Sequence, residues 1–168
     1  MLNPALTAAI AAFFPLILGF VWYNPKVFGK AWMAGAGITE DSMKGGNMAL
    51  VFGLTYVFSF FVAFSLLFVT VHQYGLNSLI LPQNGHPVDD PTGMGKQVLE
   101  MYKDSYRSFK HGALHGTIVG ITFILPIIGI NALFERRGWK YILINAGFWI
   151  VCCAVMGGIV CQLAHVAF

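Results

Sequence analysis

The stretch that decides the fold reads Gly19-Phe-Val-Trp-Tyr-Asn-Pro-Lys-Val-Phe-Gly-Lys-Ala-Trp32, and it ends the first long apolar run of the chain. Trp22 and Tyr23 carry amphipathic rings of the kind that gather at the headgroup layer of a bilayer. Pro25 stops a helix because its ring removes a backbone donor and clashes with the preceding turn. Lys26 and Lys30 then place positive charge just outside the hydrocarbon. The pattern predicts a helix that leaves a membrane through an aromatic belt and a basic exit.

The composition points to the same class of protein. Of the 168 residues, 57% are hydrophobic and 10% are charged, whereas a soluble domain carries about 25% charged residues. The net charge is +3, and the basic residues form no stripe with interleaved aromatic side chains, so we expect no nucleic-acid partner. The expected partner is the lipid bilayer.

Four apolar runs are long enough to cross a bilayer as helices, which takes about 20 residues each. They cover approximately residues 4–23, 48–72, 112–134 and 141–165. Backbone polar groups in lipid must be paired within their own segment, which favours helices. Pro15 and Pro126 lie inside the first and third runs, and we expect a kink at Pro15. The sequence thus predicts a single all-α domain, a bundle of four transmembrane helices spanning 1–168.

Two loops are long and one is short. The hydrophilic loop 75–108 begins with turn-forming sequence, and its second half has helical spacing, so we expect a short amphipathic helix between the second and third spans. In loop 24–46, Thr39 or Asp41 is a candidate cap of a short helix. Basic residues favour loops 24–46 and 135–140 as cytoplasmic, which places both termini and loop 75–108 in the periplasm. The two sides hold six and four basic residues: Lys26, Lys30, Lys44, Arg136, Arg137 and Lys140 against Lys96, Lys103, Arg107 and Lys110.

Two segments together resemble a bacterial family of small four-span membrane proteins catalogued as domain of unknown function 1761. The first is the membrane-exit motif, and the second is Asn145-Ala-Gly-Phe-Trp-Ile-Val with Met156-Gly-Gly-Ile. The resemblance implies a helical fold in the bacterial cytoplasmic (inner) membrane. It implies no activity, and no catalytic residue is carried over. The residues of the exit motif are Trp22, Tyr23, Pro25, Phe28, Gly29 and Trp32.

The third span carries a stripe of glycines. Gly112, Gly116 and Gly120 are four residues apart, a spacing that lets another helix backbone approach closely. The partner is either the fourth span, where Ala154, Gly158 and Cys161 form a similar stripe of small residues, or another subunit.

Four histidines lie near one predicted membrane surface. His72 closes the second span, His111 and His115 stand four apart at the start of the third, and His165 closes the fourth. Imidazoles bind transition metals and can also hold a haem between helices. The alternative is that each histidine is a boundary residue satisfied by water or a carbonyl group. These four residues are the candidate metal ligands.

The sequence lacks familiar catalytic patterns, and we expect no enzyme. His111-Gly-Ala-Leu-His115 lacks the glutamate of the His-Glu-x-x-His motif. Cys161 and His165 have helical spacing, but a cysteine in an apolar helix is more often a packing residue. The favoured interpretation is therefore a structural or accessory subunit, or a homo-oligomeric membrane component, without a cofactor. The alternatives are a metal- or haem-binding protein and an oligomeric channel or carrier for small solutes.

Overall fold

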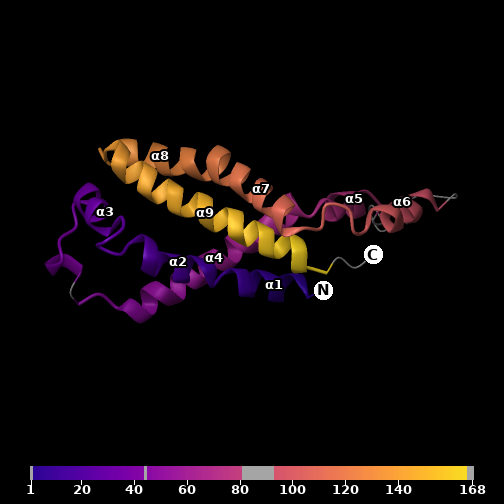
Figure 1. Cartoon of the computed structure of the whole chain (residues 1–168), viewed down its shortest axis with the longest axis horizontal. Coiled ribbons are helices and arrows are strands. Elements are labelled where there is room, and N and C mark those ends of the chain that lie inside the picture. Colours follow the sequence, from indigo (N-terminus) through magenta and orange to yellow (C-terminus); the bar gives the residue numbers. More distant parts are fainter. Residues whose placement is uncertain (1, 44, 81–92, 166–168) are drawn as a thin grey trace.

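The computed structural model describes residues 2–43, 45–80 and 93–165, and within these ranges every regular element is a helix (Figure 1). The predicted all-α class is therefore confirmed. A 3₁₀ turn at Asp41–Met43, next to Thr39, and a π-helical segment at Gly120–Ile124 complete the order. The α-helices are α1 (Pro4–Ala11), α2 (Phe14–Trp22), α3 (Gly29–Ala36), α4 (Met48–Thr70), α5 (His72–Ile80), α6 (Met94–Tyr102), α7 (Phe109–Val119), α8 (Leu125–Phe134) and α9 (Trp139–Leu163).

Four helical stretches are long and apolar enough to cross a membrane, which confirms the predicted bundle. They are Pro4–Trp22, Met48–Thr70, Phe109–Phe134 and Trp139–Leu163. Many large apolar side chains on the first three spans point outward, as lipid-facing surfaces require. The loop helix predicted between the second and third spans is α6, which buries Leu99. The turn-rich part of that loop, residues 81–92, lies outside the described residues.

The first span is interrupted where the sequence predicts its kink. α1 ends at Ala11 and α2 begins at Phe14, one residue before Pro15. Proline has no amide hydrogen to donate, so it cannot continue the hydrogen-bond ladder through this point. The third span contains the π-helical segment just before Pro126, a position where proline disturbs the preceding turn in the same way.

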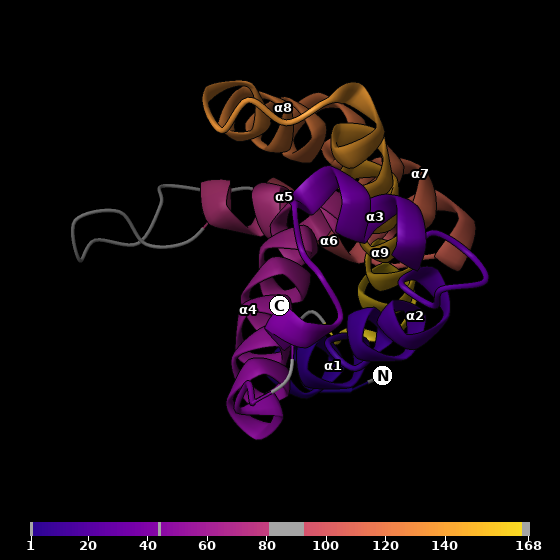
Figure 2. The ribbon, with the colours of Figure 1, turned by 90° about the vertical axis from the view of Figure 1, so that its left-hand side faces the viewer.

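α9 is the central helix of the bundle. It packs against α7, α8, α4 and the N-terminal helices (Figure 2). Half of its most hydrophobic window is buried inside the protein, against 11–28% for the other three spans. Its small side chains, including Cys152, Cys153 and Gly157, are fully buried, which allows several helices to approach it at once.

The described residues nearest the two termini, Leu2 and His165, lie side by side at the end of the bundle where α1 begins and α9 ends (Figure 1). The Leu2 amide donates to the carbonyl oxygen of Leu163 at 2.8 Å, and the His165 amide donates to that of Leu2 at 2.6 Å. α5 and α6 extend from this same end, whereas α3 and the α8–α9 turn lie at the opposite end. The residues nearest the termini therefore share one side of the membrane with α5 and α6.

Two short helices differ from the expectations. α3 falls in a stretch for which the sequence gives no helix, and the second span ends at Thr70 instead of His72. Val71 breaks the helix because its backbone is extended, with φ −107° and ψ 91°. His72 thus opens a separate helix, α5, rather than closing α4.

Candidate metal centre

Three of the four candidate histidines meet in space. His72 comes from the start of α5, and His111 and His115 come from α7. One ring nitrogen from each side chain lies within 4.8 Å of the others. The Nε2 atoms of His72 and His111 are 2.9 Å apart, which is hydrogen-bond distance. The distance between ring centroids is 5.0 Å from His72 to each of the other two and 4.5 Å between His111 and His115.

Local structure places two of these rings on α7. Ser108 caps the helix, and its Oγ accepts a hydrogen bond from the His111 amide at 3.3 Å. A helix that starts here turns residues four apart onto the same face, so His111 and His115 lie one turn apart on that face, with their rings tilted relative to each other. The helix cap and the spacing are both visible in the sequence, and together they explain this half of the cluster.

The glycine stripe fixes the direction in which those rings point. A Cβ atom on Gly116 would lie 2.0 Å from the carbonyl oxygen of Cys153, and one on Gly112 would lie 2.2 Å from that of Gly157. A Cβ atom on Gly120 would lie 2.8 Å from the Cα atom of Ile150 in α9. The structure therefore places all three glycines against α9 of the same chain. Each of the two histidines precedes a glycine by one residue, about 100° around the helix, and so emerges beside the contact with α9.

The residue after His72, Gln73, anchors the start of α5. The Gln73 side chain is 4% exposed, and its Nε2 donates to the carbonyl oxygens of Tyr102 and Ser105, both at 2.9 Å. These bonds attach α5 to the turn after α6. The Gln73 Oε1 atom is buried and has no hydrogen-bond partner among the residues that the structure describes. Gln73 and His72 both line a cavity of about 200 Å³.

Tyr106 covers the outer side of the cluster. Its ring centroid lies 5.1 Å from that of His111 and 6.2 Å from that of His72. Its backbone has φ 60°, a left-handed conformation that is uncommon for residues other than glycine and is found at functional sites. The Tyr106 carbonyl accepts a hydrogen bond from Cys161 Sγ at 3.4 Å, which connects this turn to α9.

Arg107 joins the same turn to the C-terminal end of the chain. Its Nη2 donates to the Ala164 carbonyl, while its Nε and Nη1 are buried and have no hydrogen-bond partner within the described part of the chain. Burial lowers the pKa of the Arg107 guanidinium, and burial raises the pKa of Tyr74, an effect that the Arg107 charge opposes. This cation tethers the turn that carries Tyr106.

His165 lies outside the cluster of three. α9 ends at Leu163, and the extended backbone of Ala164 leads His165 to the N-terminus. Its carbonyl oxygen accepts a hydrogen bond from Tyr74 at 3.4 Å. Cys161, its possible catalytic neighbour, donates to the carbonyl of Thr70 at 3.3 Å as well as to Tyr106. These bonds give Cys161 a structural role between three segments.

The exit motif packs on α9 at the far end of the bundle. Trp22 Nε1 donates to the Ile144 carbonyl at 3.1 Å, and the Tyr23 hydroxyl bonds Asn145 Oδ1 at 3.1 Å. Gly29 is required here, because a Cβ atom would lie 2.2 Å from the Tyr23 carbonyl. The two segments that carry the family resemblance therefore contact each other. Across the turn that holds Pro25, the Phe28 ring packs at a tilt against Trp22, and the Trp32 ring meets Tyr23 edge to face, at centroid distances of 4.7 and 5.2 Å.

The four apolar spans define a multi-pass integral membrane protein of the helical-bundle class. Residues 6–161 match the family described as protein of unknown function (DUF1761), and the chain belongs to that family. No curated protein and no solved structure matches the chain.

Proposed function

We propose that this membrane protein binds one transition-metal ion through the imidazoles of His72, His111 and His115. The observation that supports the proposal is the convergence of three ring nitrogens from two separate helices within 4.8 Å. Nitrogens bound to one tetrahedral ion at about 2.0–2.1 Å lie about 3.4 Å from one another. Ring nitrogens within 4.8 Å of one another, with one pair at 2.9 Å, bracket that spacing.

The ligand set favours borderline divalent ions. Neutral imidazole suits Zn²⁺, Cu²⁺, Ni²⁺ and iron, whereas Mg²⁺ and Ca²⁺ prefer oxygen ligands. The cluster of three contains no carboxylate and no thiolate. Three protein ligands leave one position of a tetrahedral ion open to water or another small group.

The arrangement fits a single ion better than a haem. His111 and His115 point from one face of one helix, and the His72 nitrogen meets them at the same place. Two axial haem ligands must instead approach the iron from opposite faces of a large flat ring. The adjoining cavity of about 200 Å³ is small for such a ring.

The proposal places the ion at the periplasmic face of a bacterial inner membrane. The cluster lies on the side of the termini and α6, opposite α3 and the α8–α9 turn. The basic residues of loops 24–46 and 135–140 support a cytoplasmic position for that opposite side.

We further propose that the protein has a non-catalytic role. Its association into homo-oligomers or with other subunits stays a prediction. The glycine stripe gives no support to such association, because its three glycines already pack against α9 of the same chain.

Metal titration of the purified protein tests the proposal. We expect one Co²⁺ or Zn²⁺ per chain in mild detergent, measured by elemental analysis after desalting, with a visible Co²⁺ spectrum typical of nitrogen ligands. The double substitution His111→Ala and His115→Ala removes the bound ion.

His165→Ala is the matched control, because His165 lies outside the cluster, and it retains the ion. An unloaded wild-type protein, or equal stoichiometry in the double variant, contradicts the proposal. Loss of the ion in the control alone would assign the site to different residues.

A further inference from the structure

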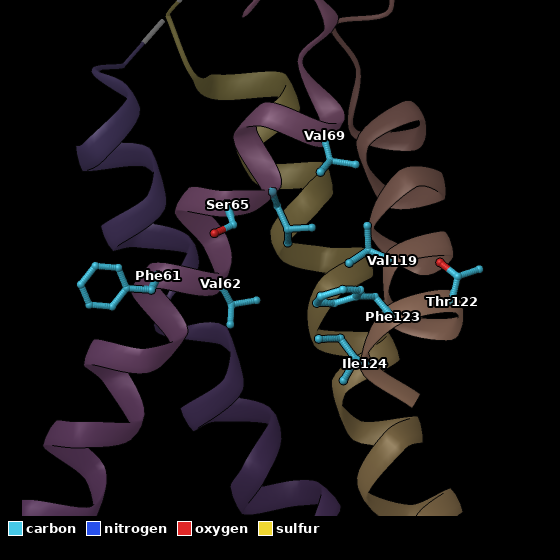
Figure 3. A pocket seen from close by; sticks show the side chains of 9 residues that line it. Phe61, Val62, Ser65, Val69, Val119, Thr122, Phe123 and Ile124 are labelled. Atoms are coloured by element: carbon cyan, nitrogen blue, oxygen red, sulfur yellow. The ribbon is translucent and has the colours of Figure 1, made fainter. Parts of the chain in front are cut away.

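An apolar groove lies within the membrane-spanning part of the protein, next to the histidine cluster. It has a volume of about 560 Å³, within the range of about 300–1,000 Å³ that is usual for small-molecule sites. One wall comes from α4 and the other from the third span, and α9 lies behind them (Figure 3). The lining residues are Phe61, Val62, Ser65, Leu66, Val69, Val119, Thr122, Phe123 and Ile124.

The groove follows from the way the helices pack. α4 and α7 both pack on α9, and the glycine stripe holds α7 tightly against it. The π-helical segment Gly120–Ile124 supplies the lower part of one wall, and such segments often occur at functional sites. The Thr122 hydroxyl donates to the Ile118 carbonyl of its own helix at 2.8 Å. Its hydrogen-bonding capacity is thus used locally, and the groove is almost entirely hydrocarbon.

One end of the groove lies directly below the three histidines. Val119 is four residues after His115 and therefore lies on the same face of α7, about 6 Å along the helix axis. Val69 is three residues before His72 on the opposite wall. From Val69 to Phe61 the α4 wall extends about 12 Å into the membrane, at about 1.5 Å per residue.

These positions identify the kind of molecule that fits. The groove is surrounded by membrane, so its occupant enters from the lipid phase and presents a hydrocarbon chain. Three neutral imidazoles leave the charge of a divalent ion uncompensated, and its open position accepts a negatively charged oxygen. A single molecule that fills the groove and also binds the open position of the ion has one hydrocarbon chain and an anionic oxygen head group.

We propose that the groove binds the chain of a long-chain carboxylate lipid whose head group completes the coordination of the metal ion at His72, His111 and His115. This inference rests on the proposed metal site. The groove then acts as the specificity determinant for the chain, and the ion acts as the receptor for the carboxylate.

Titration of the Co²⁺-loaded protein with three probes tests the inference. Palmitate is expected to change the visible Co²⁺ spectrum at concentrations at least tenfold below those at which acetate does so. Methyl palmitate has the chain without the charge, and it is expected to compete with palmitate without causing the spectral change. The inference is overturned if acetate and palmitate change the Co²⁺ spectrum at the same concentration, or if palmitate does not change the spectrum at all.

Substitutions in the groove separate the two proposals. Val119→Phe fills the groove below His115 and is expected to weaken palmitate binding at least tenfold while one Co²⁺ per chain remains bound. Val69→Phe repeats the test from the α4 wall if the first variant does not fold. Ile130→Phe, at an exposed position of α8, is the matched control and leaves palmitate binding unchanged.

Each pattern of results has one meaning. A protein that binds no Co²⁺ contradicts the proposed function itself. A protein that binds Co²⁺ but shows the same palmitate affinity in wild type and both groove variants contradicts only the lipid inference. A shift in oligomeric state caused by Val119→Phe, without loss of palmitate affinity, identifies the groove as a contact between copies and also contradicts it.

Discussion

At the scale of single residues, Gln73 fixes the start of α5, the helix that carries His72. It is nearly fully buried, and one amide group satisfies two backbone carbonyls of the turn that carries Tyr106. A buried acceptor that loses its donor costs about 1–3 kcal/mol. The sequence around Gln73 does not reveal this role, because its partners, the carbonyl groups of Tyr102 and Ser105, lie about thirty residues further along the chain.

Gln73→Leu is expected to loosen this turn without removing a ligand. The variant keeps all three histidines but loses both hydrogen bonds, so we expect stoichiometric Co²⁺ binding with at least tenfold weaker affinity, together with a lower melting temperature. Isothermal titration and thermal unfolding in detergent measure the two effects. Gln162→Leu makes the same change at an exposed position of α9 and should alter neither, and unchanged affinity in Gln73→Leu would remove its positioning role.

At the scale of elements, the contact between α7 and α9 is the one that orients the site. The helices approach so closely that the Gly116 position has no room for a methyl group. Overpacking of a close contact costs about 1–3 kcal/mol, and a displaced α7 also carries His111 and His115 away from His72.

Gly116→Ala is therefore expected to lower both thermal stability and metal affinity. Gly129→Ala is the matched control on the same span, because a Cβ atom there would have no described residue within 4 Å outside its own stretch of helix. Helix propensity favours alanine over glycine by about 1 kcal/mol, so the control should be as stable as wild type or more stable. Equal melting temperatures for the two variants would show that the α7–α9 contact tolerates separation.

The sequence predicts those elements that depend on local pattern and misses those that depend on distant contacts. Hydropathy and proline positions locate the four spans and the break before Pro15, and the four-residue spacing places His111 with His115. α3 has only eight residues, too few to be stable by itself, and it approaches α9 where Gly35 meets Tyr141. The separation of His165 from the cluster depends on the pairing of Leu2 with the C-terminal end, which the local sequence does not encode.

At the scale of the whole molecule, the two ends of the bundle have different chemistry. One end holds the termini, α5, α6 and the three histidines, and the groove begins one helical turn below them. The other end holds the aromatic exit motif, α3 and the basic α8–α9 turn. A lipid that reaches the ion from within the membrane and a metal that reaches it from the water phase would therefore meet at the same surface.

This arrangement makes the orientation of the protein testable with cysteine labelling. The native cysteines are buried, so a membrane-impermeant maleimide is expected to give little background with the wild type. Lys96 on α6 and Lys140 at the start of α9 are exposed at opposite ends of the bundle. In intact spheroplasts we expect Lys96→Cys to be labelled at once, and Lys140→Cys to be labelled only after lysis, because positively charged short loops remain in the cytoplasm. The reverse pattern would place the histidines on the cytoplasmic side, where the ion would be drawn from the cytoplasmic metal pool instead of the periplasm.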